Sequence, residues 1–77
     1  MKRSNIEGSS QIAEIGYDLP TKTMQIKFHS GGIYNYWPVG KKLYDGIMSA
    51  ESKGKYFHAN IRNNSSINYS KADELSV

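Results

Sequence analysis

Residues 23–28 show the clearest alternation of hydrophobic and polar positions in the chain. Met24, Ile26 and Phe28 are apolar, and the residues between them are polar. A period of two is typical of a β-strand with one buried face. The Ser-Gly-Gly run at 30–32 favours a turn, because glycine accepts the positive φ that a tight hairpin needs. The pattern therefore predicts a strand that turns back into a second strand.

The second strand is predicted over residues 33–37, where Ile, Tyr, Asn, Tyr and Trp follow one another. β-branched and aromatic residues of this kind are enriched in strands. Pro38 is expected to end the strand, because proline has no N–H to donate to a neighbouring strand.

The length of the hairpin loop decides which face of the sheet Tyr34 and Tyr36 occupy. A two-residue turn would put both rings on the face of Lys27. A three-residue loop of the bulged type over residues 30–32 would put them beside Phe28 on the apolar face. We favour the longer loop, because two tyrosines beside the other apolar residues make the better core.

A first strand is predicted over residues 11–17, which contain the β-branched residues Ile12 and Ile15. These two positions do not share a period of two. A β-bulge near Glu14 or Gly16 would bring both side chains to one face. A turn that contains proline then leads to the alternating strand.

The spacing of apolar residues becomes helical from Val39 to Ser52. Four apolar residues form one stripe, namely Leu43, Tyr44, Ile47 and Met48. Gly54 is predicted to end this helix. Residues 55–62 are too short for an independent helix. They are expected to form a short helical or extended segment, which Tyr56 or Phe57 holds to the sheet together with Ile61.

These elements predict an α+β domain, a three-stranded antiparallel β-meander packed by one α-helix and a short C-terminal helical or loop segment. The domain is expected to span residues 10–62. Residues 1–9 are interpreted as a flexible leader and residues 63–77 as a flexible polar tail, because both are poor in apolar residues. Within the tail, Ile67 and Tyr69 are the residues that could dock on the body or on a partner.

Length and charge narrow the class of protein. A chain of 77 residues with a formal net charge of +3 is one small domain whose basic balance suits an anionic partner. It contains no cysteine, which excludes disulfides and thiolate metal sites. No apolar run approaches the about 20 residues that span a bilayer, and no signal peptide is recognisable. We therefore expect a cytoplasmic protein without a membrane partner.

Motifs of enzyme chemistry are absent from the sequence. His29 and His58 lie on separate segments, and no HxH or HExxH pattern offers a metal site. The Gly31-Gly32 pair belongs to a turn and lacks the pattern of a phosphate-binding loop. We therefore expect a non-enzymatic protein with no catalytic residue, no metal and no cofactor.

Residues 52–62 are the best candidate for a binding site, because they combine three basic side chains with a glycine N–H and an asparagine. Such a loop suits a phosphate or an acidic surface. Alternatively, its lysines are solvated and its other polar groups satisfy backbone carbonyls. The tyrosines of the second hairpin strand are either buried rings or a stacking platform for single-stranded nucleic acid. The candidate binding residues are Lys27, Tyr34, Tyr36, Lys53, Lys55, Tyr56, Asn60 and Arg62.

Taken in order, these segments resemble the KTSC domain family, named for its occurrence at the C-terminus of some lysyl-tRNA synthetases and also found as small free-standing proteins of bacteria and phages. The resemblance covers about residues 9–62. It rests on Ser10 with Ile12, Ile15-Gly16-Tyr17-Asp18, Thr23–Phe28, Gly31-Gly32-Ile33-Tyr34-Asn35-Tyr36, Val39, Tyr44, Ser52-Lys53-Gly54-Lys55-Tyr56-Phe57 and Asn60-Ile61-Arg62. The chain departs from the family at Val39-Gly40, where relatives tend to have Val-Pro. The resemblance implies RNA binding, from the synthetase context, and carries over no catalytic residue.

Three hypotheses of function follow. The first is a module that binds RNA or single-stranded nucleic acid, with RNA favoured over DNA. Residues 52–62 and Lys27 would contact the phosphates. The second is a protein-interaction module, such as a phage or prophage accessory protein that docks on and modulates a host or phage protein. The third is a small-ligand or nucleotide pocket between the helix and the sheet. An unprotected edge strand would permit a dimer, but the sequence does not fix the oligomeric state.

Overall fold

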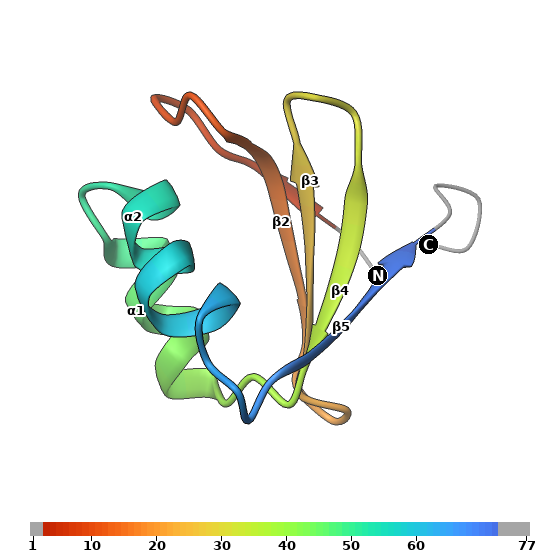
Figure 1. Ribbon diagram of the computed structural model, residues 1–77. Coiled ribbons are helices and arrows are strands. Elements are labelled where there is room, and N and C mark those ends of the chain that lie inside the picture. The colour runs from red at the N-terminus through yellow and green to blue at the C-terminus, as the bar shows by residue number, and fades with distance from the viewer. Residues whose placement is uncertain (1–2, 73–77) are drawn as a thin grey trace.

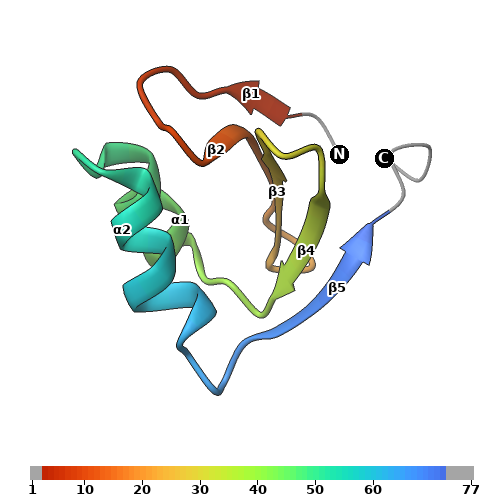
Figure 2. The same cartoon turned by 45° about the horizontal axis from the view of Figure 1, so that its top comes forward.

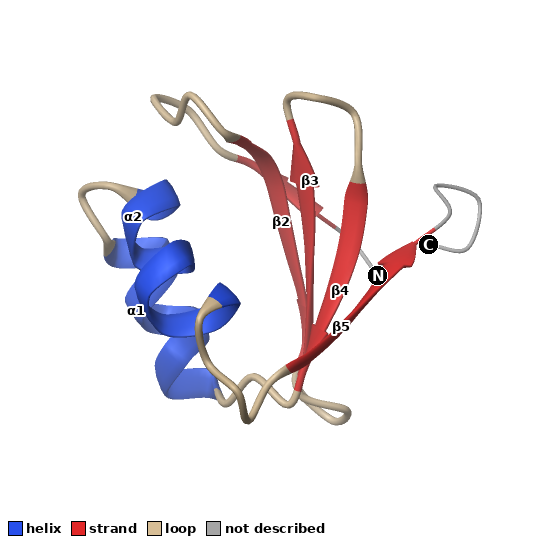
Figure 3. Cartoon of the chain, viewed as in Figure 1, coloured by secondary structure: helices blue, strands red, loops and turns tan. Residues whose placement is uncertain are grey.

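The computed structural model describes residues 3–72. They form a five-stranded antiparallel sheet in the order β1-β2-β3-β4-β5, with the helical segments on one side (Figures 1 and 3). In chain order the elements are β1 (Arg3–Asn5), β2 (Ile12–Asp18), β3 (Thr23–Phe28), β4 (Ile33–Trp37), α1 (Lys41–Ser49), α2 (Lys53–Phe57), the π-helical turn η1 (His58–Arg62) and β5 (Asn68–Ala72).

The expectation of three strands was wrong, because one more strand pairs at each edge of the meander. β1 pairs with β2 and β5 pairs with β4, both antiparallel. Both lie in stretches assigned to the leader and the tail, whose outermost residues 1–2 and 73–77 lie outside the described residues. These polar strands are held by backbone hydrogen bonds to their neighbours, so their own hydropathy gives no strand signal.

The predicted bulge in the first long strand is confirmed. Ile12 lies opposite Phe28 and Glu14 opposite Lys27, so Ala13 is the extra residue on β2. A bulge changes which side chains share a face. As a result the side chains of Ile12 and Ile15 are both buried in the core.

The prediction that Tyr34 and Tyr36 lie on the apolar face is also confirmed. Tyr34 is opposite Ile26 and Tyr36 is opposite Met24, so the four side chains share one face. The loop itself lies one residue earlier than expected, at 29–31, with Phe28 donating its N–H to the Gly32 carbonyl. The last loop residue, a glycine, has a φ of +102°, a value that L side chains rarely adopt.

The single helix predicted up to Gly54 is instead two helices. α1 ends at Ser49, and Ala50 has an extended backbone. Ser52 then caps α2, because its side-chain oxygen accepts a hydrogen bond from the Lys55 N–H at 3.4 Å. Gly54 therefore lies inside the first turn of α2 and ends nothing. The chain continues without a break into η1, so the short segment at 55–62 is helical.

The core lies between the sheet and the helical segments, which both views place on the same side (Figure 2). Its fully buried helical residues are Ile47, Phe57 and Ile61, which belong to one cluster with the apolar residues of β2 and β3. Burial of this kind contributes about 1.5–3 kcal/mol for each large apolar side chain. Within residues 3–72, no helix is long and apolar enough to cross a membrane.

One glycine decides how closely the two helices approach. A Cβ built on Gly46 of α1 would collide with the Tyr56 hydroxyl of α2 and lie 2.6 Å from its Cζ. Alanine is intrinsically better in a helix by about 1 kcal/mol, but overpacking costs about 1–3 kcal/mol. At this position we expect the collision to outweigh the gain.

We predict that Gly46→Ala lowers the free energy of unfolding, by up to about 2 kcal/mol, because the ring of Tyr56 must shift and carry α2 with it. Urea unfolding of the two proteins measures the difference. The double variant Gly46→Ala/Tyr56→Phe should recover part of the loss, since the colliding hydroxyl is absent. Equal or greater stability of Gly46→Ala would contradict the contact.

Candidate functional site

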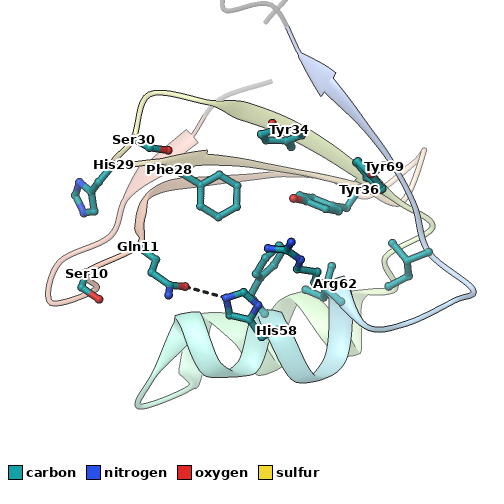
Figure 4. A pocket seen from close by; sticks show the side chains of 13 residues that line it. Ser10, Gln11, Phe28, His29, Ser30, Tyr34, Tyr36, His58, Arg62 and Tyr69 are labelled. Carbon is teal, nitrogen blue, oxygen red and sulfur yellow. Dashed lines mark hydrogen bonds between the residues drawn. The ribbon is translucent and has the colours of Figure 1, made fainter.

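A cleft of about 790 Å³ lies between the helical segment α2–η1 and the end of the sheet formed by β4 and β5 (Figure 4). Side chains of β3, β4 and β5 form one wall, and side chains of α2 and η1 form the other. Its lining residues are Ser10, Gln11, Phe28, His29, Ser30, Tyr34, Tyr36, Phe57, His58, Ile61, Arg62, Ile67 and Tyr69. The volume is in the range of small-ligand sites.

Three tyrosine rings on the sheet, Tyr34, Tyr36 and Tyr69, form the tyrosine triad of this cleft. Their centroids lie 6.5, 6.3 and 6.4 Å apart in the three pairs, and the rings are inclined by 30–53° to one another. Pairing across β4 and β5 holds Tyr36 directly opposite Tyr69. Tyr36 is 7% exposed and Tyr69 is 69% exposed, so the triad runs from the core to the surface.

Burial changes the chemistry of the innermost ring. Desolvation raises the pKa of Tyr36 to about 12, although the positive charge of Arg62 opposes the shift. Its hydroxyl therefore stays neutral to a higher pH than that of an ordinary tyrosine. The rings of Tyr36 and Phe57 also pack in an edge-to-face arrangement, with centroids 5.2 Å apart and planes at 75°.

Cationic and polar side chains face the triad from the helical wall (Figure 4). Arg62 is exposed, and its guanidinium group makes no hydrogen bond or ion pair with any residue in the described range 3–72. His58 lies with its Nε2 3.1 Å from Oε1 of Gln11. No Asp or Glu is among the lining residues of the cleft. The electrostatic field of the cleft therefore favours an anion or an electron-rich ring.

Of the eight residues predicted from the sequence, three come together in this cleft: Tyr34, Tyr36 and Arg62. Lys53 and Lys55 instead line a neighbouring hollow of about 430 Å³, together with Glu7 and Glu51. Two carboxylates against two ammonium groups leave this hollow without net charge. The ammonium group of Lys53 also donates to the Ala50 carbonyl, at 3.2 Å.

The remaining three predicted residues lie away from the cleft. Tyr56 packs against α1 at Gly46. Asn60 donates its side-chain amide to the Tyr56 carbonyl at 3.2 Å, which stabilises the helical turn. Lys27 lies on the opposite face of the sheet, with its Nζ 3.9 Å from Glu14.

That opposite face carries a row of polar contacts across four strands. Arg3 bonds to Glu14 at 2.8 Å and to Gln25 at 2.6 Å, and Gln25 donates to Asn35 at 2.9 Å. The hydrogen bond from Arg3 lowers the pKa of the Glu14 carboxyl. Lys27 thus belongs to a satisfied polar network and not to the cleft.

Sequence reasoning missed several residues of the site. Ile67 and Tyr69 were expected to dock on the body or on a partner, and both line the cleft. The sequence did not predict the place of Tyr69 beside Tyr36, because that place depends on pairing with a strand about thirty residues earlier. Lys71 lies opposite Tyr34 on the same face, at the outer edge of the triad. Gln11 lines the cleft and contacts His58 through its side-chain oxygen. No local pattern marks Lys71 or Gln11 as part of the site. Among the residues described, no group of three or more potential metal ligands occurs.

Comparison with known proteins gives concordant matches. The sequence pattern of the KTSC domain matches residues 8–64. A lysine–tRNA ligase of Trichormus variabilis is 39% identical over 56 residues, which are 73% of this chain and 10% of the ligase. A small protein of Stutzerimonas stutzeri is 31% identical over 58 residues, 75% of this chain and 80% of that protein. The chain thus spans only about a tenth of the ligase.

A crystal structure of a KTSC domain protein from Yersinia pestis has a similar fold. It superposes with a TM-score of 0.83 at 30% sequence identity, covering 94% of this chain and 97% of the other. The fold described above is therefore shared over nearly its whole described length. The matched pattern at 8–64 ends before β5, so Tyr69 lies outside it.

The raised pKa of Tyr36 gives a prediction. The folded state favours the neutral form of Tyr36. The contribution of this ring to the free energy of unfolding is therefore fully present below the ordinary tyrosine pKa of about 10, and it is lost as the pH rises towards 12. In a spectrophotometric titration of the tyrosines, Tyr36→Phe should remove the absorbance change of one phenol that ionises near pH 12. If Tyr36→Phe instead removed a phenol that ionises near the ordinary tyrosine pKa of about 10, the burial of Tyr36 would be contradicted.

Proposed function

The chain belongs to the KTSC domain family, and we propose that it is a non-enzymatic module that binds single-stranded RNA in the cleft between the tyrosine triad and η1. The family context supports this proposal, because the domain occurs C-terminally in cyanobacterial lysyl-tRNA ligases and as small stand-alone proteins. A module appended to an enzyme named for tRNA is reasonably placed to contact RNA.

The observation that carries the proposal is the combination of an aromatic wall with an unopposed cation. Five phenylalanine and tyrosine rings line the cleft, from Phe28, Tyr34, Tyr36, Phe57 and Tyr69, and within residues 3–72 no carboxylate lines it. Proteins that bind single strands stack unpaired bases on aromatic rings and hold the backbone with basic side chains. Base–aromatic stacking contributes about 1–3 kcal/mol per base.

Single strands fit this cleft better than duplexes do. A paired base presents only its edge in a groove, whereas the triad offers ring faces that only an unstacked base can cover. RNA is favoured over DNA because polar groups at the end of the cleft formed by Gln11, His29 and Ser30 can meet a ribose hydroxyl.

A protein partner is the second candidate, and one observation favours it. β5 is an edge strand with β4 as its neighbour in the described sheet, and four of its five residues are exposed. An exposed edge can accept a strand from a host or phage protein, or from a second copy of the chain. Such binding would leave the cleft empty and would be insensitive to changes at Arg62.

We predict that a labelled single-stranded oligoribonucleotide binds at low salt and binds more weakly as salt rises. Arg62→Ala should weaken binding about tenfold and make the slope of log K against log salt shallower by about 0.7, because one phosphate contact is lost. Fluorescence anisotropy across a salt series measures both quantities, with duplex RNA and single-stranded DNA as weaker competitors.

The matched control is Lys42→Ala, which removes one positive charge from an exposed position of α1 that does not line the cleft. It should leave affinity nearly unchanged. Absence of binding to every single strand at low salt would sink the proposal. An equal loss in the two variants would show attraction by overall charge, without a site.

A further inference from the structure

The tyrosine triad presents one stacking position and not a row of them. All three centroid separations lie between 6.3 and 6.5 Å, so the rings stand at the corners of a nearly equilateral triangle. Their planes are inclined to one another by 30–53°. A surface that binds several successive bases would instead spread its rings along the track of the strand.

The charges near the triad are too few to hold a polyanion by themselves. Arg62 lines the cleft, and Lys71 lies opposite Tyr34 at its edge. The side chain of neither residue forms an ion pair or hydrogen bond within residues 3–72. The lysines of the neighbouring hollow are balanced by two glutamates, and Lys27 lies on the other face. Among the lysine and arginine side chains of residues 3–72, Arg62 and Lys71 are therefore the two placed to contact phosphates at the triad.

We propose that the cleft captures one unpaired nucleobase, seated on the tyrosine triad beneath Arg62, and that stacking supplies most of the binding free energy. This inference rests on the proposed function and specifies its ligand as a single extruded base with one or two flanking phosphates. With two contacts the slope of log K against log salt is about −1.4, since each contact to a single strand contributes about −0.7.

Tyr69 is the specificity-determining ring in this arrangement. It is the outermost member of the triad and is 69% exposed, so it can be replaced without opening the core. It contacts both Tyr34 and Tyr36. β5 lies beyond the residues that the family pattern matches, 8–64, so the match does not include Tyr69.

The test uses three labelled RNA trinucleotides with the same backbone: tri-adenylate, a trimer with one adenine between two abasic residues, and a fully abasic trimer. We expect the one-base trimer to bind within about threefold of tri-adenylate, the statistical factor for three registers. The fully abasic trimer should bind at least about tenfold more weakly, as loss of one stacked base implies.

Variants of the full chain locate the contact. Tyr69→Leu should weaken binding of the one-base trimer about fivefold to tenfold and leave binding of the abasic trimer unchanged. Tyr69→Phe keeps the ring and should behave like the unmodified protein. Equal thermal unfolding of the three proteins excludes misfolding as the cause.

Each outcome distinguishes the two proposals. Equal binding of abasic and base-containing trimers with a steep salt slope would overturn the one-base pocket and leave RNA binding intact. A one-base trimer as weak as the abasic trimer would show that several bases are needed, which also overturns it. No binding of tri-adenylate or of longer single strands would overturn the proposed function itself.

Discussion

The register between β3 and β4 is the constraint on which the rest of the structure depends. Pairing of Ile26 with Tyr34 and of Met24 with Tyr36 puts both tyrosines on the face that the helices cover. A slip of one residue would move every side chain of β4 to the other face. The core would then lose Tyr36, and the cleft would lose two of its three tyrosines.

The helical segments are too short to cover the whole of this face. α1 has nine residues and α2 with η1 has ten, and their buried residues cluster with the apolar side chains of β2 and β3. Cover therefore falls off towards the edge of the sheet, from Tyr36 of β4 at 7% exposed to Tyr69 of β5 at 69% exposed. The cleft follows from this partial cover, because Arg62, the last residue of the helical segment, lines the same cleft as the exposed ring of Tyr69.

Hydropathy patterns predict the parts of this fold whose side chains enter the core. The bulge beside Ile12 and the apolar face of Tyr34 and Tyr36 follow from the need to bury large residues together. The edge strands β1 and β5 could not be predicted in this way, because backbone pairing forms them and their side chains are mostly exposed. The lysines at 53 and 55 formed a basic cluster in the sequence, whereas the fold brings Glu7 to them from the opposite end of the domain. Glu51 is close to these lysines in the sequence, but the approach of Glu7 is a tertiary contact and has no local signature.

The central claim, that an unpaired base binds on the tyrosine triad, is tested most directly by NMR spectra of the six tyrosine rings during a titration with tri-adenylate. The account predicts shifts of the ring signals of Tyr34, Tyr36 and Tyr69. Tyr17 and Tyr44 provide an internal reference, because they stack on each other with centroids 4.4 Å apart and do not line the cleft. Shifts confined to those two rings, or no shift in the triad at saturating ligand, would contradict the account.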